Sequence, residues 1–303
     1  MGASSTTGIL VIDKESGPTS HDVVARLRRI IDERRVGHCG TLDPMATGVL
    51  VVCVGRFTRL NEWLSAGEKE YIAELVLGAK SDTFDAQGVI AGVEGVSAPS
   101  SSAVERGLEP FRGVIMQRPP AYSAVKVGGK RSYELARQNK AVPLAARPAT
   151  ISVLTVAEYE YPRLVLRVVC SRGTYVRTIA HDFGELMRCG AYIGGLRRTR
   201  VGSMDLAMAH SLDDIDRAVA GGGLKDCFVP PHIALSGLDQ VSLEESQLES
   251  FAHGNAVAFA GRAPAGECAV FDDERYLCGI GRWQEKGALL RPVKVLKATT
   301  YAN

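Results

Sequence analysis

The sequence predicts an α+β protein in which a larger mixed domain precedes a small β-rich module. Two apolar or alternating stretches, residues 49–54 and 69–78, have the patterns of strands. Residues 20–31 place apolar side chains at helical spacing and therefore predict an amphipathic helix. Beyond Pro230-Pro231 the composition shifts to short apolar runs between glycine-rich turns. The chain has 303 residues, of which 46% are hydrophobic, which is enough for a substantial core.

The composition argues against a secreted, metal-stabilised or membrane-spanning protein. Seven cysteines are scattered without a C-x-x-C pair or a His/Cys cluster at zinc spacing. Residues 1–8 lack a basic segment followed by a long apolar run, and no apolar run approaches the length of a bilayer span. We therefore expect a cytoplasmic protein with reduced thiols and no structural metal. The net charge of +2 conceals local basic clusters, which matter more for nucleic-acid binding than the total.

The N-terminal elements are a strand and a helix joined by a polar turn. Residues 8–12 are a short apolar run, and residues 13–19 form the turn, which carries Lys14. Ser20 is a suitable N-cap for the helix that follows. The polar face of this helix is basic, which is equally consistent with a solvated surface and with nucleic-acid binding. Its basic residues are Arg26, Arg28 and Arg29.

The segment between this helix and the apolar strand is the most informative part of the chain. Asp43 precedes a proline, which pushes its backbone out of the helical region. Glycines at positions 37, 40 and 48 remove side chains around it, so a ligand or a second backbone can approach closely. The pattern is also typical of an ordinary turn. The alternative interpretation is a carboxylate fixed on a stiff loop beside an unfilled groove.

The middle of the chain contains a long basic excursion. Residues 116–148 are rich in proline, glycine, lysine and arginine, and few of them could anchor a core. A segment of this kind is usually either disordered or functional. It follows a small-residue linker at residues 97–102 and a helix predicted over residues 103–111.

Two later segments combine strand patterns with basic and aromatic side chains. Residues 164–170 predict a strand that leads into Ser-Arg-Gly-Thr-Tyr-Val-Arg at residues 171–177. Tyr175 and Arg177 would point the same way in an extended chain but would diverge in the first turn of a helix. Residues 191–202 then predict another strand with a dense basic patch.

Residues 37–48, Gly-His-Cys-Gly-Thr-Leu-Asp-Pro-Met-Ala-Thr-Gly, resemble the signature loop of the TruB-type tRNA pseudouridine synthases. Asp43 stands at the nucleophile position of that loop. Three further motifs follow in the family's order, at residues 69–78, 170–184 and 191–202. The resemblance covers roughly residues 8–201, and it departs from the family's Asp-Lys-Pro turn because Glu15 follows Lys14.

The resemblance implies a pseudouridine synthase fold, in which a mixed, largely antiparallel central sheet is flanked by helices and loops. This catalytic domain would span residues 1–232. Within it, residues 116–148 would form a mobile thumb that closes over RNA. Residues 236–303 would form a small β-rich, PUA-like RNA-binding domain.

The resemblance also implies roles for individual residues. Asp43 is the expected covalent nucleophile, Tyr71 would pack against the target base, and Arg177 would pair with Asp43. An arginine partner should favour the charged carboxylate and lower its pKa. The implied substrate-binding residues are His38, Tyr71, Tyr175, Leu196 and Lys14. The residues expected to contact RNA phosphates are Lys126, Lys130, Arg131, Arg197 and Arg198.

Each of these residues also has a purely structural interpretation. Tyr71 has the pattern of a half-buried strand aromatic, and Leu196 that of a core residue. Arg177 would serve equally well in a structural ion pair, and His38 could be an ordinary loop histidine.

The expected function is the isomerisation of uridine 55 in the T loop of tRNA to pseudouridine, on a flipped-out nucleotide and without cofactor or metal. The expected partner is the T-arm of tRNA, and we expect a monomer with no obligatory protein partner. A non-catalytic RNA-binding or tRNA-folding protein on the same scaffold is the alternative, but it would not need Asp43. A guide-RNA-dependent relative is a third possibility, and such chains carry longer terminal extensions.

Overall fold

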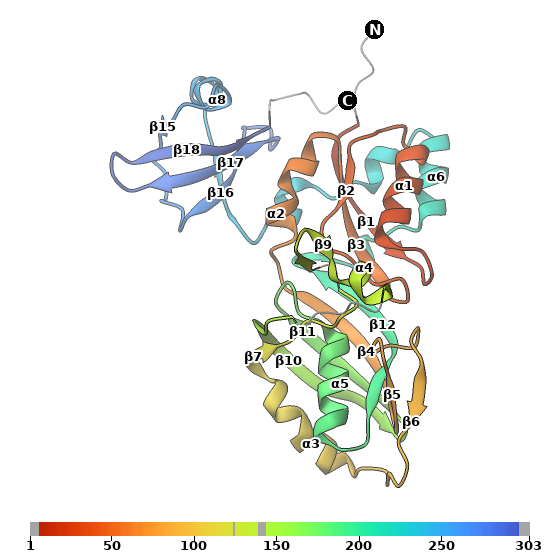
Figure 1. The fold of residues 1–303 in the computed structure, drawn as a ribbon. Coiled ribbons are helices and arrows are strands. Elements are labelled where there is room, and N and C mark those ends of the chain that lie inside the picture. Colours follow the sequence, from red (N-terminus) through yellow and green to blue (C-terminus); the bar gives the residue numbers. More distant parts are fainter. Residues whose placement is uncertain (1–5, 124, 139–143, 297–303) are drawn as a thin grey trace.

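The computed structural model describes residues 6–123, 125–138 and 144–296. Within these segments, nine strands form one long sheet that runs through most of the molecule (Figure 1). The strands are β1 (Gly8–Lys14), β2 (Val36–His38), β3 (Thr47–Val54), β4 (Lys69–Leu77), β7 (Gly113–Gln117), β10 (Arg147–Glu160), β11 (Arg163–Cys170), β12 (Ala191–Val201) and β13 (Met204–Asp205).

The sheet is mixed and largely antiparallel, which confirms the predicted fold class. Its order is β1-β3-β12-β4-β11-β10-β7, with β2 paired to β3 and β13 paired to β12. Among the pairs described for this sheet, β12 with β3 is the parallel one, and the rest are antiparallel. The parallel contact joins Arg197 to Thr47 and Arg198 to Gly48. It therefore brings the basic patch of β12 against the end of the signature loop.

Four helices cover one face of the sheet. They are α1 (Ser20–Ile30), α3 (Ser101–Leu108), α5 (Val176–Leu186) and α6 (Leu212–Ala220). At one end α1 lies beside α6, and at the other α3 lies beside α5 (Figure 1). Apolar residues such as Leu27 of α1 and Phe183 of α5 are fully buried in one continuous cluster with the strands. No helix of the described segments combines the length and apolar character that a bilayer crossing requires.

Strands β1 and β3 each contain an uninterrupted apolar run, Ile9–Ile12 and Val49–Val54, because both of their faces are covered there. Leu10 and Leu50 join the cluster that contains α1, whereas Ile9 and Val51 point to the opposite face. A strand buried on both sides loses the polar alternation of a half-exposed strand. This explains the uninterrupted apolar run at residues 49–54.

The opposite face of β1 and β3 shares a hydrophobic cluster with the segment of residues 55–64, with residues 234–235 and with the C-terminal module, and α2 (Asn61–Leu64) lies between the two sheets (Figure 1). The sheet of this module has the order β14-β16-β17-β18-β15. The strands are β14 (Asp239–Ser242), β15 (Val257–Ala258), β16 (Glu267–Phe271), β17 (Leu277–Gln284) and β18 (Leu289–Val295), and α8 (Glu245–Ala252) accompanies them. Phe271 and Ile280 share one hydrophobic cluster with Ile9 and Val51. The Trp63 indole also donates to Glu267 at 2.7 Å, so polar contacts join the two parts as well.

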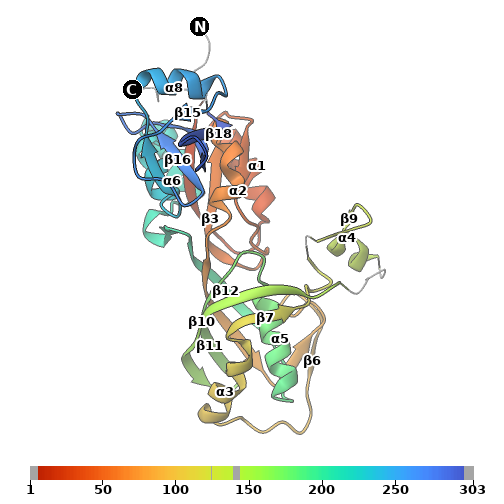
Figure 2. The ribbon, with the colours of Figure 1, turned by 90° about the vertical axis from the view of Figure 1, so that its left-hand side faces the viewer.

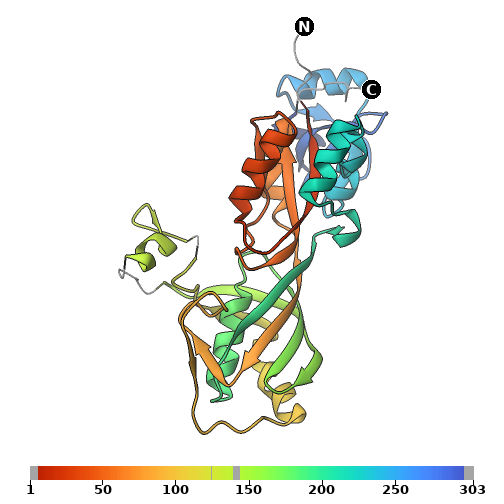
Figure 3. The same cartoon turned by 90° about the vertical axis from the view of Figure 1, so that its right-hand side faces the viewer.

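The predicted thumb leaves the sheet between β7 and β10. It contains a short hairpin of β8 (Lys126–Val127) and β9 (Lys130–Arg131), followed by α4 (Ser132–Arg137). Figures 2 and 3 show this yellow-green segment standing clear of the strands. The side chains of Lys126, Lys130 and Arg131 lie outside what the structure describes, so their phosphate contacts stay a prediction.

Smaller elements complete the described fold. They are the β5 (Ala79–Ser81) and β6 (Ile90–Gly92) hairpin, α2 (Asn61–Leu64), α7 (Pro231–Ala234) and 3-10 turns at Gly55–Leu60, Glu109–Phe111, Leu206–Met208 and Leu224–Cys227.

The cap of α1 differs from the prediction by one residue. Thr19 is the N-cap, and it forms a reciprocal capping box with Asp22. Ser20 is instead buried, where its hydroxyl donates to the Leu42 carbonyl at 3.0 Å and accepts from the Leu42 N–H at 2.8 Å. Both backbone groups of the residue before Asp43 are therefore held by α1.

Candidate active site

Lys14 holds the loop that carries Asp43. Its ammonium donates to the carbonyls of Pro44 at 3.0 Å and Ala46 at 2.7 Å, and to that of Glu15 at 2.8 Å. The side chain is only 1% exposed. Burial lowers the pKa of Lys14 to about 8, although the neighbouring Asp43 charge opposes this. Because three carbonyls occupy the three ammonium hydrogens, we replace the predicted substrate contact of Lys14 with a role in fixing the loop.

Arg198 holds the loop from the other side. Its guanidinium donates to the carbonyls of Val49 at 2.7 Å, Gly40 at 3.2 Å and Thr41 at 3.2 Å. The side chain is 1% exposed, so the prediction that Arg198 contacts RNA phosphates is wrong. The strand alternates, and this arginine points into the protein whereas its neighbour Arg197 does not.

Gly48 is required where β12 passes the end of the loop. Its φ is +96°, and a Cβ atom there would lie 2.2 Å from the Arg198 carbonyl oxygen. A side chain at this position would separate β3 from β12, and with it the loop from Arg198.

Arg177 binds Asp43 with two nitrogens. Nε lies 2.9 Å from Oδ2, and Nη2 lies 3.2 Å from Oδ1. Such a fork fixes the orientation of a carboxylate as well as its position. Tyr175 is the extended N-cap of α5, and Arg177 lies in the first helical turn, so the two side chains diverge.

Arg177 also binds a second carboxylate, that of Asp85. Nη1 lies 3.1 Å from Asp85 Oδ2 and donates to the Thr83 carbonyl at 3.1 Å, while Nη2 donates to the Tyr122 carbonyl at 3.0 Å. The Arg177 side chain is 7% exposed and that of Asp85 is 4% exposed, whereas that of Asp43 is 34% exposed. The arginine is therefore sealed inside, and the Asp43 carboxylate is still accessible.

The electrostatics of Asp43 differ from the prediction. Burial raises the pKa of the Asp43 carboxyl above its ordinary value; Arg177 lowers it, and the charge of Asp85 raises it further. Arg177 lowers this pKa as predicted, but burial and the charge of Asp85 outweigh its effect, so the net shift is upward. The exposed face of the Asp43 side chain does not compensate for the hydration that the surrounding protein removes from the rest of the carboxyl group.

Tyr71 and Leu196 come from neighbouring strands and lie in the same cluster. Tyr71 is on β4 and Leu196 on β12, and each is 8% exposed. Burial raises the pKa of the Tyr71 hydroxyl, and a hydrogen bond with Arg198 lowers it. The Asp43 charge also raises this pKa. Arg198 thus links the Tyr71 side chain to the Asp43 loop.

Tyr175 is held through its backbone by Gln117. The Gln117 amide donates to the Tyr175 carbonyl at 2.9 Å and accepts from the Tyr175 N–H at 2.7 Å. Gln117 is 4% exposed and ends β7, so the start of the thumb and the start of α5 are joined here. Burial raises the pKa of Tyr175, Ser123 lowers it through a hydrogen bond, and Asp43 raises it. The Tyr175 hydroxyl is therefore within the electrostatic influence of Asp43.

Models of one protein family match nearly the whole chain. The model of the TruB family pseudouridylate synthase N-terminal domain matches residues 28–176, and that of the tRNA pseudouridylate synthase B C-terminal domain matches residues 177–235. A third model, pseudouridine synthase II TruB, C-terminal, matches residues 240–296. The tRNA pseudouridine synthase B of Heliobacterium modesticaldum is 43% identical over 252 residues, which are 82% of this chain and 81% of that protein. The chain belongs to the TruB family.

Other TruB relatives align over almost their full length. The tRNA pseudouridine synthase B of Dehalococcoides mccartyi is 38% identical over 290 residues, covering 94% of this chain and 97% of that protein. That of Leifsonia xyli is 42% identical, covering 86% and 87%. Among solved structures, a chain of a Cbf5-Nop10-Gar1 complex has a TM-score of 0.73 at 26% identity, covering 97% of this chain and 84% of that chain. A chain of an H/ACA RNP bound to a substrate RNA has a TM-score of 0.74 at 23% identity, which supports the fold.

In this TruB protein, Asp85 and Gln117 are site residues that sequence reasoning missed. Asp85 accepts hydrogen bonds from the Thr83 hydroxyl at 2.6 Å and the Gln87 N–H at 3.0 Å, which aim its other oxygen at Arg177. The polar run at residues 82–88 is typical of a turn, but no local pattern indicates that a carboxylate there faces an arginine 92 positions away.

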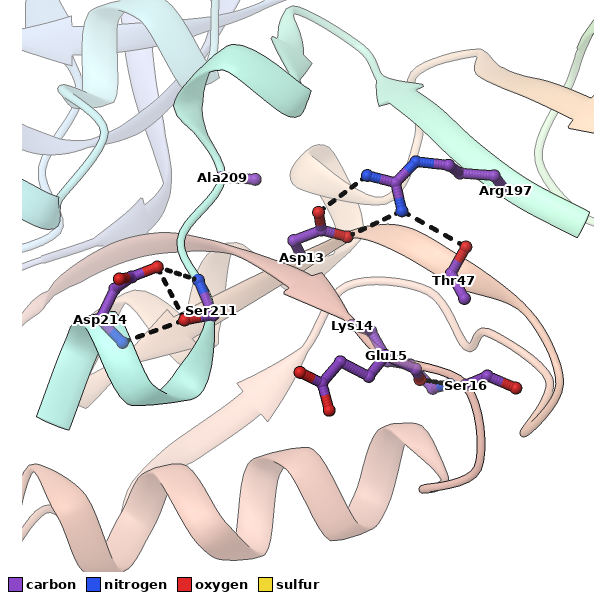
Figure 4. A pocket seen from close by; sticks show the side chains of 9 residues that line it. All are labelled: Asp13, Lys14, Glu15, Ser16, Thr47, Arg197, Ala209, Ser211 and Asp214. Atoms are coloured by element: carbon purple, nitrogen blue, oxygen red, sulfur yellow. Dashed lines mark hydrogen bonds and ion pairs between the residues drawn. The ribbon is translucent and has the colours of Figure 1, made fainter.

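Arg197 lies at the rim of a separate pocket of about 420 Å³ (Figure 4). It is 42% exposed and forms a fork with Asp13, with nitrogen–oxygen distances of 2.8 and 3.2 Å. The lining residues are Asp13, Lys14, Glu15, Ser16, Thr47, Arg197, Ala209, Ser211 and Asp214. Asp43 is not among them, so this pocket is not the Asp43 site. The predicted phosphate contact of Arg197 stays a prediction.

His38 ends β2 at the start of the TruB signature loop. Its carbonyl accepts a hydrogen bond from the Asn61 side chain at 2.8 Å, which anchors the loop to α2. Within the described segments, no group of three or more His, Cys, Asp or Glu side chains is placed to hold a metal ion.

Proposed function

We propose that this protein converts uridine 55 in the T loop of tRNA to pseudouridine, with Asp43 as the covalent nucleophile. The observation that carries the proposal is the Asp43 carboxylate, held by two Arg177 nitrogens yet 34% exposed. A nucleophile must be oriented and must still be accessible to the substrate. The relatives named tRNA pseudouridine synthase B, at 37–43% identity, support the choice of tRNA as substrate.

The reaction exchanges one bond between the ribose and the uracil. Attack by Asp43 divides the exchange into easier steps, because the covalent adduct lets the bond between C1′ and N1 break. The uracil then turns and C1′ bonds to C5, and the bond between Asp43 and the nucleotide breaks, which regenerates the carboxylate. The proton on C5 leaves to solvent and N1 gains a proton, so the product is an isomer of the substrate. No oxidant, reductant or cofactor is needed for this balance.

The residues around Asp43 have complementary roles in this proposal. Tyr71 supports the flipped uracil by stacking, Tyr175 contacts it from the α5 side, and Leu196 backs the pocket. His38 stacks in the space that the base vacates. Extruding a base from its stack costs about a few kcal/mol, which these contacts offset.

Basic residues outside the pocket hold the RNA backbone. Arg197 is exposed, and a phosphate could replace Asp13 as its partner. Lys126, Lys130 and Arg131 of the thumb would contact phosphates on the opposite side. Because the detached uracil must be retained, closure of the thumb would also seal the site.

The test uses a tRNA transcript labelled with tritium at uridine C5, in which pseudouridine formation releases the label. We expect about one equivalent of release with the natural transcript and none when uridine 55 is replaced by cytidine. D43N should release no label but should still bind the transcript in a filter assay. Full release from the cytidine 55 transcript would disprove the assigned position. Equal release by D43N and wild type, or none by either, would disprove the enzymatic role and favour the RNA-binding alternative.

A further inference from the structure

Two side chains of α5 contact the same turn of the chain, residues 83–85. Arg177 Nη1 binds the Thr83 carbonyl and the Asp85 carboxylate, each at 3.1 Å. His181 follows four residues later, and its ring stacks on Phe84 with centroids 3.8 Å apart and planes 11° apart. Residues four apart lie on one face of a helix. The two groups that Arg177 Nη1 binds therefore belong to the immediate chain neighbours of the residue on which His181 stacks.

The backbone of Phe84 is in an unusual conformation. Its φ is +66°, in the left-handed region that bulky side chains rarely adopt. Such a conformation persists when the surrounding structure imposes it, and it is common at functional sites. Here the Phe84 N–H donates to the Ser81 carbonyl at 3.1 Å, and the Phe84 carbonyl accepts from the Ile193 N–H at 3.0 Å. The His181 ring is the side-chain contact that fixes the aromatic group of the same residue.

The orientation of Phe84 decides where both Arg177 partners point. The Thr83 carbonyl before it and the Asp85 side chain after it both bind one guanidinium, and the backbone angles of Phe84 set how these two groups lie relative to one another. If Phe84 relaxed to an ordinary conformation, Thr83 and Asp85 could not both face Arg177. The arginine would then lose two of the contacts that set the angle of its fork on Asp43.

We infer that His181 is a positioning residue for the reaction, acting through the Phe84 stack on the Asp85–Arg177–Asp43 network. The inference rests on the proposed catalytic role of Asp43. His181 need not touch substrate for this role. It keeps the turn in the conformation that holds Arg177, and a displacement of about 1 Å at such a group can cost about a hundredfold in rate.

The test compares single-turnover and steady-state tritium release for H181A, H181F and wild type. We expect H181A to lower kcat about tenfold with KM within about twofold of wild type, because RNA binding does not use this contact. H181F keeps an aromatic ring against Phe84, so its kcat should stay within about threefold of wild type. L186A shortens an exposed side chain of the same helix and should behave as wild type. Thermal unfolding of every variant checks that the fold is intact.

A double-mutant cycle isolates the stacked pair. Glycine tolerates a positive φ, so F84G removes the ring without forbidding the backbone conformation. If the two rings act together, F84G/H181A should be no slower than the slower single variant.

A wild-type protein without activity would refute the proposed function itself. An active wild type with H181A unchanged, with H181F as slow as H181A, or with additive losses in the cycle, would overturn the role of His181. Should H181A unfold, H181F and F84G decide the outcome.

Discussion

Arg177 and Asp43 lie 134 positions apart in the chain, and the fork between them is also tied to Asp85. Arg177 thereby connects three segments: the signature loop, the turn that contains Asp85 and the first turn of α5. The guanidinium is nearly sealed from solvent, and only Asp43 presents an accessible oxygen. In this arrangement the Asp43 carboxylate faces outward, while the Asp85 carboxylate neutralises Arg177 and holds it in place.

R177K should lower kcat by about a hundredfold or more. Lysine keeps the positive charge but has no planar fork, so it cannot bind Asp43 with two nitrogens and Asp85 with a third. Tritium release under saturating transcript measures kcat, and filter binding measures affinity, which should change little. A variant with near-wild-type kcat would show that the fork is not needed.

D85N should shift the acidic limb of the pH–activity profile to lower pH. The charge of Asp85 raises the pKa of Asp43, so removing that charge lowers it. Asp43 must be ionised to attack, and activity is lost as pH falls through its pKa. The acidic limb of the kcat/KM profile therefore moves to lower pH. The maximal rate also falls, because Arg177 loses a partner. An acidic limb that moves up, or that does not move, would contradict this prediction.

K14M should reveal a pH-dependent contribution of Lys14 to stability. The folded pKa of Lys14 is lowered from 10.5 to about 8, so the unfolded chain binds more protons between these values. The penalty for burying the charge is fully present below pH 8 and is relieved as pH rises towards 10.5. Wild type should gain stability relative to K14M over this window, by at most about 3.5 kcal/mol, since one pKa unit corresponds to about 1.4 kcal/mol. Urea unfolding at pH 7 and pH 9.5 measures this; a relative loss at the higher pH would refute it.

R197M and R198M should separate RNA binding from stability, although the residues are adjacent. R198M removes a buried guanidinium from three carbonyls and should destabilise the fold by about 3 kcal/mol. R197M breaks an exposed ion pair worth about 0–1 kcal/mol. R197M should instead weaken tRNA binding and reduce the slope of log affinity against log salt by about one. Melting curves and salt titrations distinguish the two, and a stable R198M with weak RNA binding would reverse our assignment.

Local pattern was sufficient for some features and misleading for others. The apolar run of residues 49–54 identified a buried strand, and the order of the motifs indicated the family and the pair Asp43 and Arg177. The same patterns placed Lys14 and Arg198 at the substrate and on RNA, whereas both are buried against loop carbonyls. The local sequence around a basic side chain does not show whether that side chain faces solvent or a cluster of carbonyl groups. Only the packing of β12 against β3 distinguishes them.

By itself the sequence determined the class of fold, the family and the residue expected to attack, because these depend on periodicity and on a long motif with fixed order. Tertiary structure alone decided that Asp85 shares Arg177 with Asp43, that burial raises the Asp43 pKa, and that His181 stacks on Phe84. Those features arise from groups brought together across tens of residues and from the exclusion of water around them. Neither the spatial proximity of these groups nor their loss of solvent can be inferred from a local stretch of sequence.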